Sequence, residues 1–295
     1  VFILEVLTQI PFSMKLFKVV KQMLPDDSKY WKEATMPYGY QGDDVKNLNL
    51  IVDKLIESRR YVTALNIIGR SEFESVIDAE SIYRILMLTG TEESIGNEVI
   101  DNYAAQKVIG WFQQQKCIDL KVRSDIDFIY LPVFESYSEI QPHALTTRLS
   151  LDPDYFCKLL ELSFKKNTED EKQKVELSSG LYDRLYEVIF HYSVVPGLDW
   201  NGNFDELRFL SWMSYVKKWS KKNDRYEVAM HTVGSGLSYV KLDEEKLPSM
   251  VIIKELNKAE NKELRRGYYL GIINQRGVHF IDPEGKPEFK MAEEY

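Results

Sequence analysis

Apolar residues recur three and four positions apart along most of the chain, which is the periodicity of amphipathic helices. The longest clean example has its apolar positions at Phe204, Leu207, Leu210, Met213, Val216 and Trp219. Strand-like alternation occurs only in short stretches such as Val278 to Ile281, where we expect at most a minor β-hairpin. The pattern therefore predicts an all-α fold.

Turn residues divide these helices into pairs. Ser58-Arg59-Arg60 separates a helix predicted over 45–56 from one predicted over 61–68. Two antiparallel helices joined by a short turn are the unit of a helical solenoid. No fixed repeat period emerges, which argues against a regular TPR or ankyrin array. The prediction is an irregular α-solenoid of antiparallel helix pairs, of the HEAT-like kind.

The most polar stretch of the 295-residue chain is K-K-N-T-E-D-E-K-Q-K-V-E-L-S-S-G at 165–180. Such a composition is typical of a linker or mobile loop. We therefore expect an N-terminal helical array over 1–164 and a C-terminal one over 181–295, or one continuous superhelix. The chain opens within an apolar run and ends within a predicted helix, so we expect it to be part of a longer protein.

Two glycines lie inside the helix predicted over 259–274. Gly267 and Gly271 lie four residues apart on one face, although glycine inside a helix costs about 1 kcal/mol relative to alanine. The first interpretation is close approach of a neighbouring helix, and the second is a ligand or partner backbone on that face. Gly234-Ser235-Gly236 lacks the lysine and spacing of a phosphate-binding loop and is interpreted as a weak point in a helix.

Composition and net charge limit the classes of function that the sequence suggests. A net charge of -8 argues against a general nucleic-acid binder, which needs a basic footprint. The two cysteines, Cys117 and Cys157, form no CxxC motif, so a reducing, cytoplasmic compartment fits best. No segment is long enough to span a membrane, and we expect no membrane partner.

Few residues in the sequence are candidates for catalysis or metal binding. The acidic pairs Asp43/Asp44 and Asp125/Asp127 could hold a divalent metal, but at predicted helix starts they are expected to act as caps. The four histidines are dispersed, without the clustering that a zinc site needs. We expect no catalytic residue, no metal and no cofactor.

Two basic groups are the candidate binding residues. The first is the run Lys217, Lys218, Lys221, Lys222 and Arg225, interleaved with Trp212, Tyr215 and Trp219. Cations with aromatic rings can grip a nucleic-acid strand, and the alternative is a solvated helix end. The second group is Arg265 and Arg266, beside Gly267, which could meet a phosphate or an acidic partner surface, together with Arg276.

Several landmarks spread over the chain carry a resemblance. They are Ile10-Pro11-Phe12 with Tyr30-Trp31, Leu151-Asp152-Pro153, Val195-Pro196-Gly197 with Asp199 and Gly202, and Arg266-Gly267 with Gly271, Arg276-Gly277-Val278 and Gly285. Together they resemble the helical C-terminal region of large bacterial multidomain proteins, some of them linked to antiviral defence and carrying an NTPase or effector module. The resemblance implies a sensing, scaffolding or partner-binding array and no catalytic residue.

We therefore expect a non-enzymatic protein-interaction or sensor/scaffold region of a larger cytosolic bacterial protein. Its anchors would be Trp212, Trp219, Arg265, Arg266 and Arg276. The alternative is a nucleic-acid-binding module that uses the basic face Lys217–Arg225. An enzyme of another class would need a cleft with converging titratable groups, and a structural spacer would expose no apolar or aromatic patch.

Overall fold

A computed structural model describes residues 2–10, 12–25, 28–96, 98–134, 140–164, 166, 188, 194–198, 203–238 and 250–276. This part of the chain is all-α, as predicted, and its one β pairing is an isolated antiparallel bridge between Leu198 and Phe204. The chain divides into two compact units, residues 1–145 and 146–295. None of the helices in the described ranges is both long enough and apolar enough to cross a bilayer.

Two predictions made from the sequence concern residues outside the described ranges. The minor hairpin expected at Val278 to Ile281 lies outside the described residues. The same holds for the polar linker expected at 165–180, apart from Lys166. Both expectations, and the division of the chain at that linker, stay predictions.

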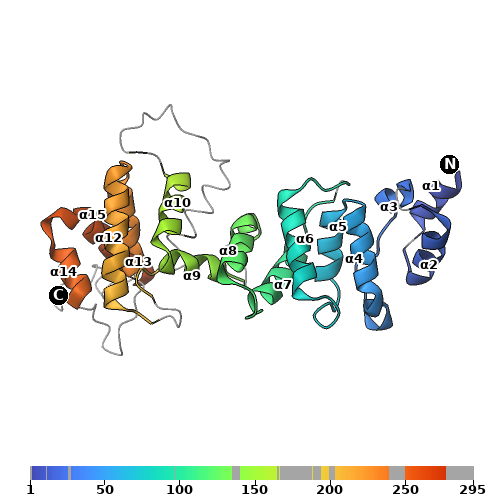
Figure 1. Cartoon of the computed structure of the whole chain (residues 1–295), viewed down its shortest axis with the longest axis horizontal. Helices are drawn as coiled ribbons and strands as arrows, with labels where there is room; N and C mark the ends of the chain where they lie inside the picture. The colour runs from blue at the N-terminus through green and yellow to red at the C-terminus, as the bar shows by residue number, and fades with distance from the viewer. Residues whose placement is uncertain are drawn as a thin grey trace, which may run out of the picture. The chain divides into compact units, whose positions relative to one another are not determined.

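Unit 1 is a succession of short helices, shown from blue to green in Figure 1. They are α1 (Phe2–Gln9), α2 (Met14–Met23), α3 (Lys29–Glu33), the 3-10 helix η1 (Gly42–Asn47), α4 (Leu48–Glu57), α5 (Tyr61–Gly69), α6 (Ala79–Thr91), α7 (Asn102–Gln113), α8 (Leu120–Ile129) and the 3-10 helix η2 (Leu131–Val133). The boundary between the units falls within α9 (His143–Leu151).

Helix α5 is the centre of unit 1. It contacts α4, α6 and α7, and all but one of its residues are buried. Its only strongly polar side chain is Asn66, whose amide nitrogen donates to the Val99 carbonyl (3.0 Å) while its oxygen accepts from the Asp101 N–H (2.9 Å). A buried amide is stable only when it is hydrogen-bonded in this way. Asn66 thus fixes the chain that leads into α7.

Acidic residues begin several helices, because a carboxylate accepts from the unpaired N–H groups of the first turn. Asp78 caps α6 through the Ser81 N–H (2.7 Å), and Asp152 followed by Pro153 begins α10 (Pro153–Ser163). The prediction for α8 was wrong, because this helix begins after Asp119. Asp125 and Asp127 consequently lie inside α8 and do not cap it.

Unit 2 contains, besides α10, the helices α12 (Glu206–Lys222), α13 (Tyr226–Leu237), α14 (Met250–Asn257), the 3-10 helix η4 (Ala259–Asn261) and α15 (Lys262–Arg276). Helix α13 packs along α15 with the closest helix contact of the unit. The longest of these helices is α12, over the apolar stretch that gave the cleanest helical pattern.

Glycines on both helices make the contact between α13 and α15 possible. A Cβ atom added at Gly267 would fall on the backbone carbonyl of His231, and one added at Gly234 would fall on the carbonyl of Leu264. Gly271 likewise lies against Ser238. The close approach predicted for Gly267 and Gly271 is confirmed. The weak point predicted at Gly234 is instead the matching half of the same backbone-to-backbone contact.

We expect Gly267→Ala to destabilise unit 2 by about 1–3 kcal/mol, because the new methyl group forces two backbones apart. This cost exceeds the gain of about 1 kcal/mol in helix propensity. Urea unfolding followed by circular dichroism would measure the loss. The control is Leu270→Ala on the outer side of α15, for which a change below about 1 kcal/mol is expected. Equal effects of the two substitutions would contradict the backbone contact.

Candidate functional site

The structure places the two predicted tryptophan anchors of α12 differently. Trp212 is only 4% exposed, and its ring centroid lies 4.8 Å from that of Phe156 on α10. Trp219 is half-buried. Trp212 therefore belongs to the core of unit 2 and offers almost no surface to a partner, whereas part of Trp219 remains accessible.

The basic run Lys217–Arg225 begins on α12 and ends just before α13, and its members differ in exposure. Lys217 pairs with Glu255 (2.9 Å) and approaches Glu260 (3.9 Å), with its side chain 16% exposed. Arg225 is buried and donates to the carbonyls of Phe164 (3.0 Å) and Asn223 (3.0 Å). Two of the five cations of this run are thus engaged inside the unit. The exposed members are Lys218, Lys221 and Lys222.

Glu255 is the centre of a charged cluster that joins three elements. Its carboxylate pairs with Lys217 of α12 and Lys258, and accepts from the amide of Asn261 in η4 (3.2 Å). Burial by itself raises the pKa of Glu255, but hydrogen bonds from Lys258 and Lys217 outweigh burial and hold this pKa below its ordinary value of 4.5. The stabilisation is present above pH 4.5 and is lost as the pH falls through the lowered pKa.

The second predicted basic group consists of Arg265, Arg266 and Arg276, and its two described side chains have different surroundings. Arg265 donates to the carbonyls of Leu256 (2.7 Å) and Lys258 (2.9 Å), and so satisfies backbone acceptors at the end of α14. Arg266 is exposed, 3.8 Å from Glu263. The side chain of Arg276 lies outside the described residues. Of the two described arginines, Arg265 is thus used inside the unit and Arg266 lies at its surface.

Asp127 is the most unusual titratable group among the described residues. Its carboxylate accepts from Gln113 Nε2 (2.7 Å) and from the backbone N–H of Leu145 (3.0 Å), in the first turn of α9. Desolvation raises the pKa of Asp127 to about 7, although these donors and Arg123 act in the opposite direction. Asp127 thus accepts from the first turn of α9, whereas the sequence predicts that it caps its own helix.

The described residues offer few groups suited to metal binding or thiol chemistry. No group of three or more His, Cys, Asp or Glu side chains there is arranged to hold a metal ion. Asp43 and Asp44 lie within η1. Cys157 is buried, which raises the pKa of its thiol to about 12, whereas Cys117 is exposed.

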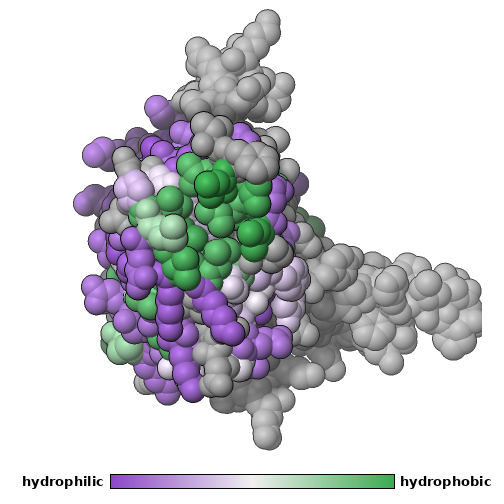
Figure 2. Space-filling model, turned by 90° about the vertical axis from the view of Figure 1, so that its right-hand side faces the viewer, coloured by the Kyte–Doolittle hydropathy of each residue, from purple (hydrophilic) through white to green (hydrophobic). Residues whose placement is uncertain are grey.

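An exposed apolar surface on α1 and α2 is the feature that sequence reasoning missed. Figure 2 shows apolar side chains gathered in one patch, bordered by hydrophilic residues, at the end of unit 1 that carries these helices. The exposed apolar residues there are Ile3 (74%), Val6 (45%), Ile10 (42%), Val19 (52%) and Met23 (75%). We call these five residues the α1–α2 face.

The sequence contains a signal for this face. Its pattern indicates one apolar side of α2 that includes both Val19 and Val20. Adjacent residues of a helix lie about 100° apart, so both cannot face the same neighbour. In the structure Val20 and Phe17 are buried, while Val19 and Met23 are turned to solvent.

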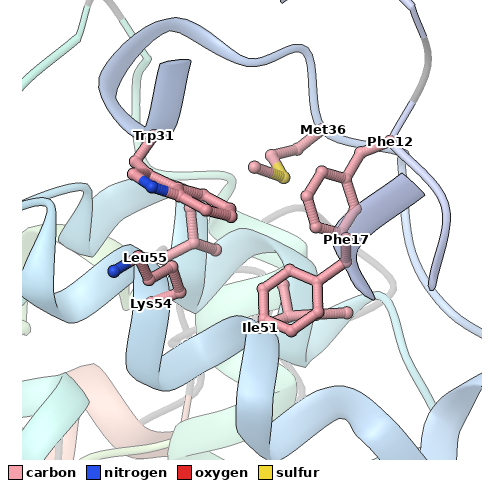
Figure 3. Close-up of a pocket in the computed structure, with 7 residues that line it drawn as sticks. All are labelled: Phe12, Phe17, Trp31, Met36, Ile51, Lys54 and Leu55. Atoms are coloured by element: carbon pink, nitrogen blue, oxygen red, sulfur yellow. The ribbon is translucent and has the colours of Figure 1, made fainter. Parts of the chain in front are cut away.

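The inner side of α2 is firmly packed. Phe17 meets the edge of Trp31 (5.8 Å between centroids), and the Lys54 ammonium lies 5.0 Å from the Trp31 ring. Figure 3 shows the side chains around a small cavity of about 10 Å³, which are Phe12, Phe17, Trp31, Met36, Ile51, Lys54 and Leu55. A cavity of this size holds at most one water molecule. It is a packing defect and not a ligand site.

Comparison of the chain with family models, curated proteins and solved structures gave no match. The geometry of the described residues is therefore the basis for a functional proposal.

We expect Lys217→Ala to cost about 2 kcal/mol of stability, because it leaves the buried Glu255 carboxylate with one fewer cation. The matched control is Lys218→Ala, the exposed neighbour, with an expected change within about 0.5 kcal/mol. Chemical unfolding at neutral pH would measure both changes. If the two variants lose equal stability, the Lys217–Glu255 pair is not a structural contact.

The stability of unit 1 should fall as the pH rises from about 4 to about 7. The folded pKa of Asp127 lies above its ordinary value of 3.8, so the unfolded chain ionises this group first. The shift corresponds to about 4 kcal/mol across this pH range. Asp127→Asn should remove this part of the pH dependence, as measured by urea unfolding at several pH values. An unchanged pH dependence in the variant would contradict the assignment.

Proposed function

We propose that this chain is a non-enzymatic protein-interaction region, acting as a scaffold or sensor within a larger protein. The observation that carries the proposal is the α1–α2 face, whose five apolar residues are 42–75% exposed. Contiguous exposed apolar surface with a polar border is typical of an interaction site. A structural spacer would bury or lack such a surface.

An irregular α-solenoid is the architecture that we propose for unit 1. The contacts of α5 with α7 and of α6 with α8 support it, because corresponding helices of successive pairs meet in a solenoid. Polar contacts recur at similar separations. Tyr40 N–H donates to Ser71 Oγ, and Arg70 Nε donates to Asp101; the partners in each pair are 31 residues apart in the sequence. Asp101 N–H donates to Asn66, which lies 35 residues away in the sequence.

Nucleic-acid binding is the weaker proposal. Its basic face retains Lys218, Lys221 and Lys222, while Lys217 and Arg225 are engaged in internal contacts. Each cation removed from a phosphate-binding surface lowers both the affinity and its salt dependence. The proposal of a bacterial, cytosolic, defence-related context rests on the sequence landmarks alone.

The proposal can be tested by an affinity pull-down from infected and uninfected bacterial cells with the full chain as bait. We expect a specific protein to be recovered by the wild type and lost with Val19→Asp/Met23→Asp. The control is Val99→Asp, since Val99 is an 83% exposed valine of unit 1 outside the α1–α2 face.

Three results would contradict the proposal. The first is the absence of any specific protein, and the second is equal recovery by the wild type and the Val19→Asp/Met23→Asp variant. The third is recovery of nucleic acid alone, released by salt, which would favour the face of Lys218, Lys221 and Lys222.

A further inference from the structure

We propose that the partner of the α1–α2 face is an amphipathic helix whose apolar stripe is flanked by acidic residues. This inference rests on the proposed function and adds the chemistry of the partner. Three properties of the face support it: the spacing of its apolar residues, the charge beside them and the rigidity of their support.

The spacing of the apolar residues matches the stripe of a helix. Ile3, Val6 and Ile10 lie three and four residues apart along α1 and its end, and Val19 and Met23 lie four apart on α2. Figure 2 shows apolar side chains gathered in one patch at this end of unit 1. A partner helix with anchors at i, i+3 or i+4 and i+7 presents the same period to such a surface.

The charge beside the face is positive, although the whole chain has a net charge of -8. Helix α2 carries the exposed residues Lys15, Lys18 and Lys21 and no acidic residue. The only acidic residue of α1 is Glu5. Acidic residues along the flank of a partner stripe would therefore complement α2 and orient the bound helix.

The same charges argue against a second copy of this chain. A symmetric dimer would place each face against itself, and the three lysines of one α2 would approach those of the other. An anionic lipid surface is also a poorer fit. Membrane-surface helices commonly insert aromatic side chains, and the described aromatic residues next to the face, Phe12 and Phe17, are buried.

The face is held in place by hydrogen bonds on its inner side. The Thr35 N–H and hydroxyl both donate to the Thr8 carbonyl (3.0 and 2.9 Å), which fixes the end of α1. The Phe12 N–H donates to the Thr35 carbonyl (3.2 Å), and Arg60 donates to the Ala34 carbonyl (2.7 Å). A surface that is already ordered loses little conformational freedom on binding.

The test uses the full chain and three synthetic helical peptides of about 20 residues. All three have the same leucine stripe, and the flanks carry glutamate, glutamine or lysine. Fluorescence anisotropy gives the affinities at low and high salt. We expect the glutamate peptide to bind tightest and the lysine peptide weakest, with the difference shrinking at high salt.

Two substitutions with matched controls locate the binding. Val19→Asp/Met23→Asp should weaken binding of the glutamate peptide by at least about tenfold, and Val99→Asp should not. Lys15→Glu/Lys18→Glu should weaken it by a similar factor, while Lys116→Glu/Lys121→Glu, at exposed lysines elsewhere in unit 1, should have no effect. Unchanged thermal unfolding would show that the variants keep their fold.

Several outcomes would overturn the proposal. One is equal binding of all three peptides, and another is binding that neither the face nor the lysine variant weakens. Self-association in sedimentation that Val19→Asp/Met23→Asp abolishes would identify a second copy instead. Binding to phosphatidylserine vesicles without binding to any peptide would identify a lipid surface. If all peptides fail while the pull-down still recovers a face-dependent protein, the interaction function stands and the partner class is wrong.

Discussion

The described part of the chain is built from helices without a sheet, so each helix must bury its apolar side against other helices. Burial of apolar area contributes roughly 25 cal/mol per Å², and a short isolated helix is not stable without it. Helix α5 satisfies this requirement on all sides, since it lies among α4, α6 and α7. The outer side of α1 and α2 does not, and this difference makes the α1–α2 face the most informative surface of the described chain.

The same packing explains why a few charged residues are internal connectors. Bringing helix ends together buries backbone carbonyls and side-chain amides, which cost free energy unless they are hydrogen-bonded. Arg225 and Arg265 donate to such carbonyls, and Lys217 neutralises the buried Glu255. Of the run that looks like a binding face in the sequence, Lys217 therefore links α12 to α14, while Lys218, Lys221 and Lys222 stay exposed.

The sequence predicts features that depend on neighbouring residues, and it misses contacts between residues that are far apart along the chain. Local rules correctly predicted the all-α class and the close helix contact at Gly267. The start of α8 was missed because several residues near Asp119 can act as caps. The pairing of Lys217 with Glu255 joins residues 38 positions apart, and no local pattern reports such a contact. The burial of Trp212 likewise depends on Phe156, on another helix.

The α1–α2 face divides its contributions between two kinds of interaction. Aliphatic side chains are non-directional and supply affinity to any apolar surface of suitable shape. They cannot by themselves select one partner or fix the direction of a bound helix. In the proposed complex, the lysines of α2 would supply that selection, because a wrongly oriented or basic helix would place like charges together. Recognition that combines both kinds requires the partner stripe and its acidic flank to coincide, which few solvent-exposed helices satisfy.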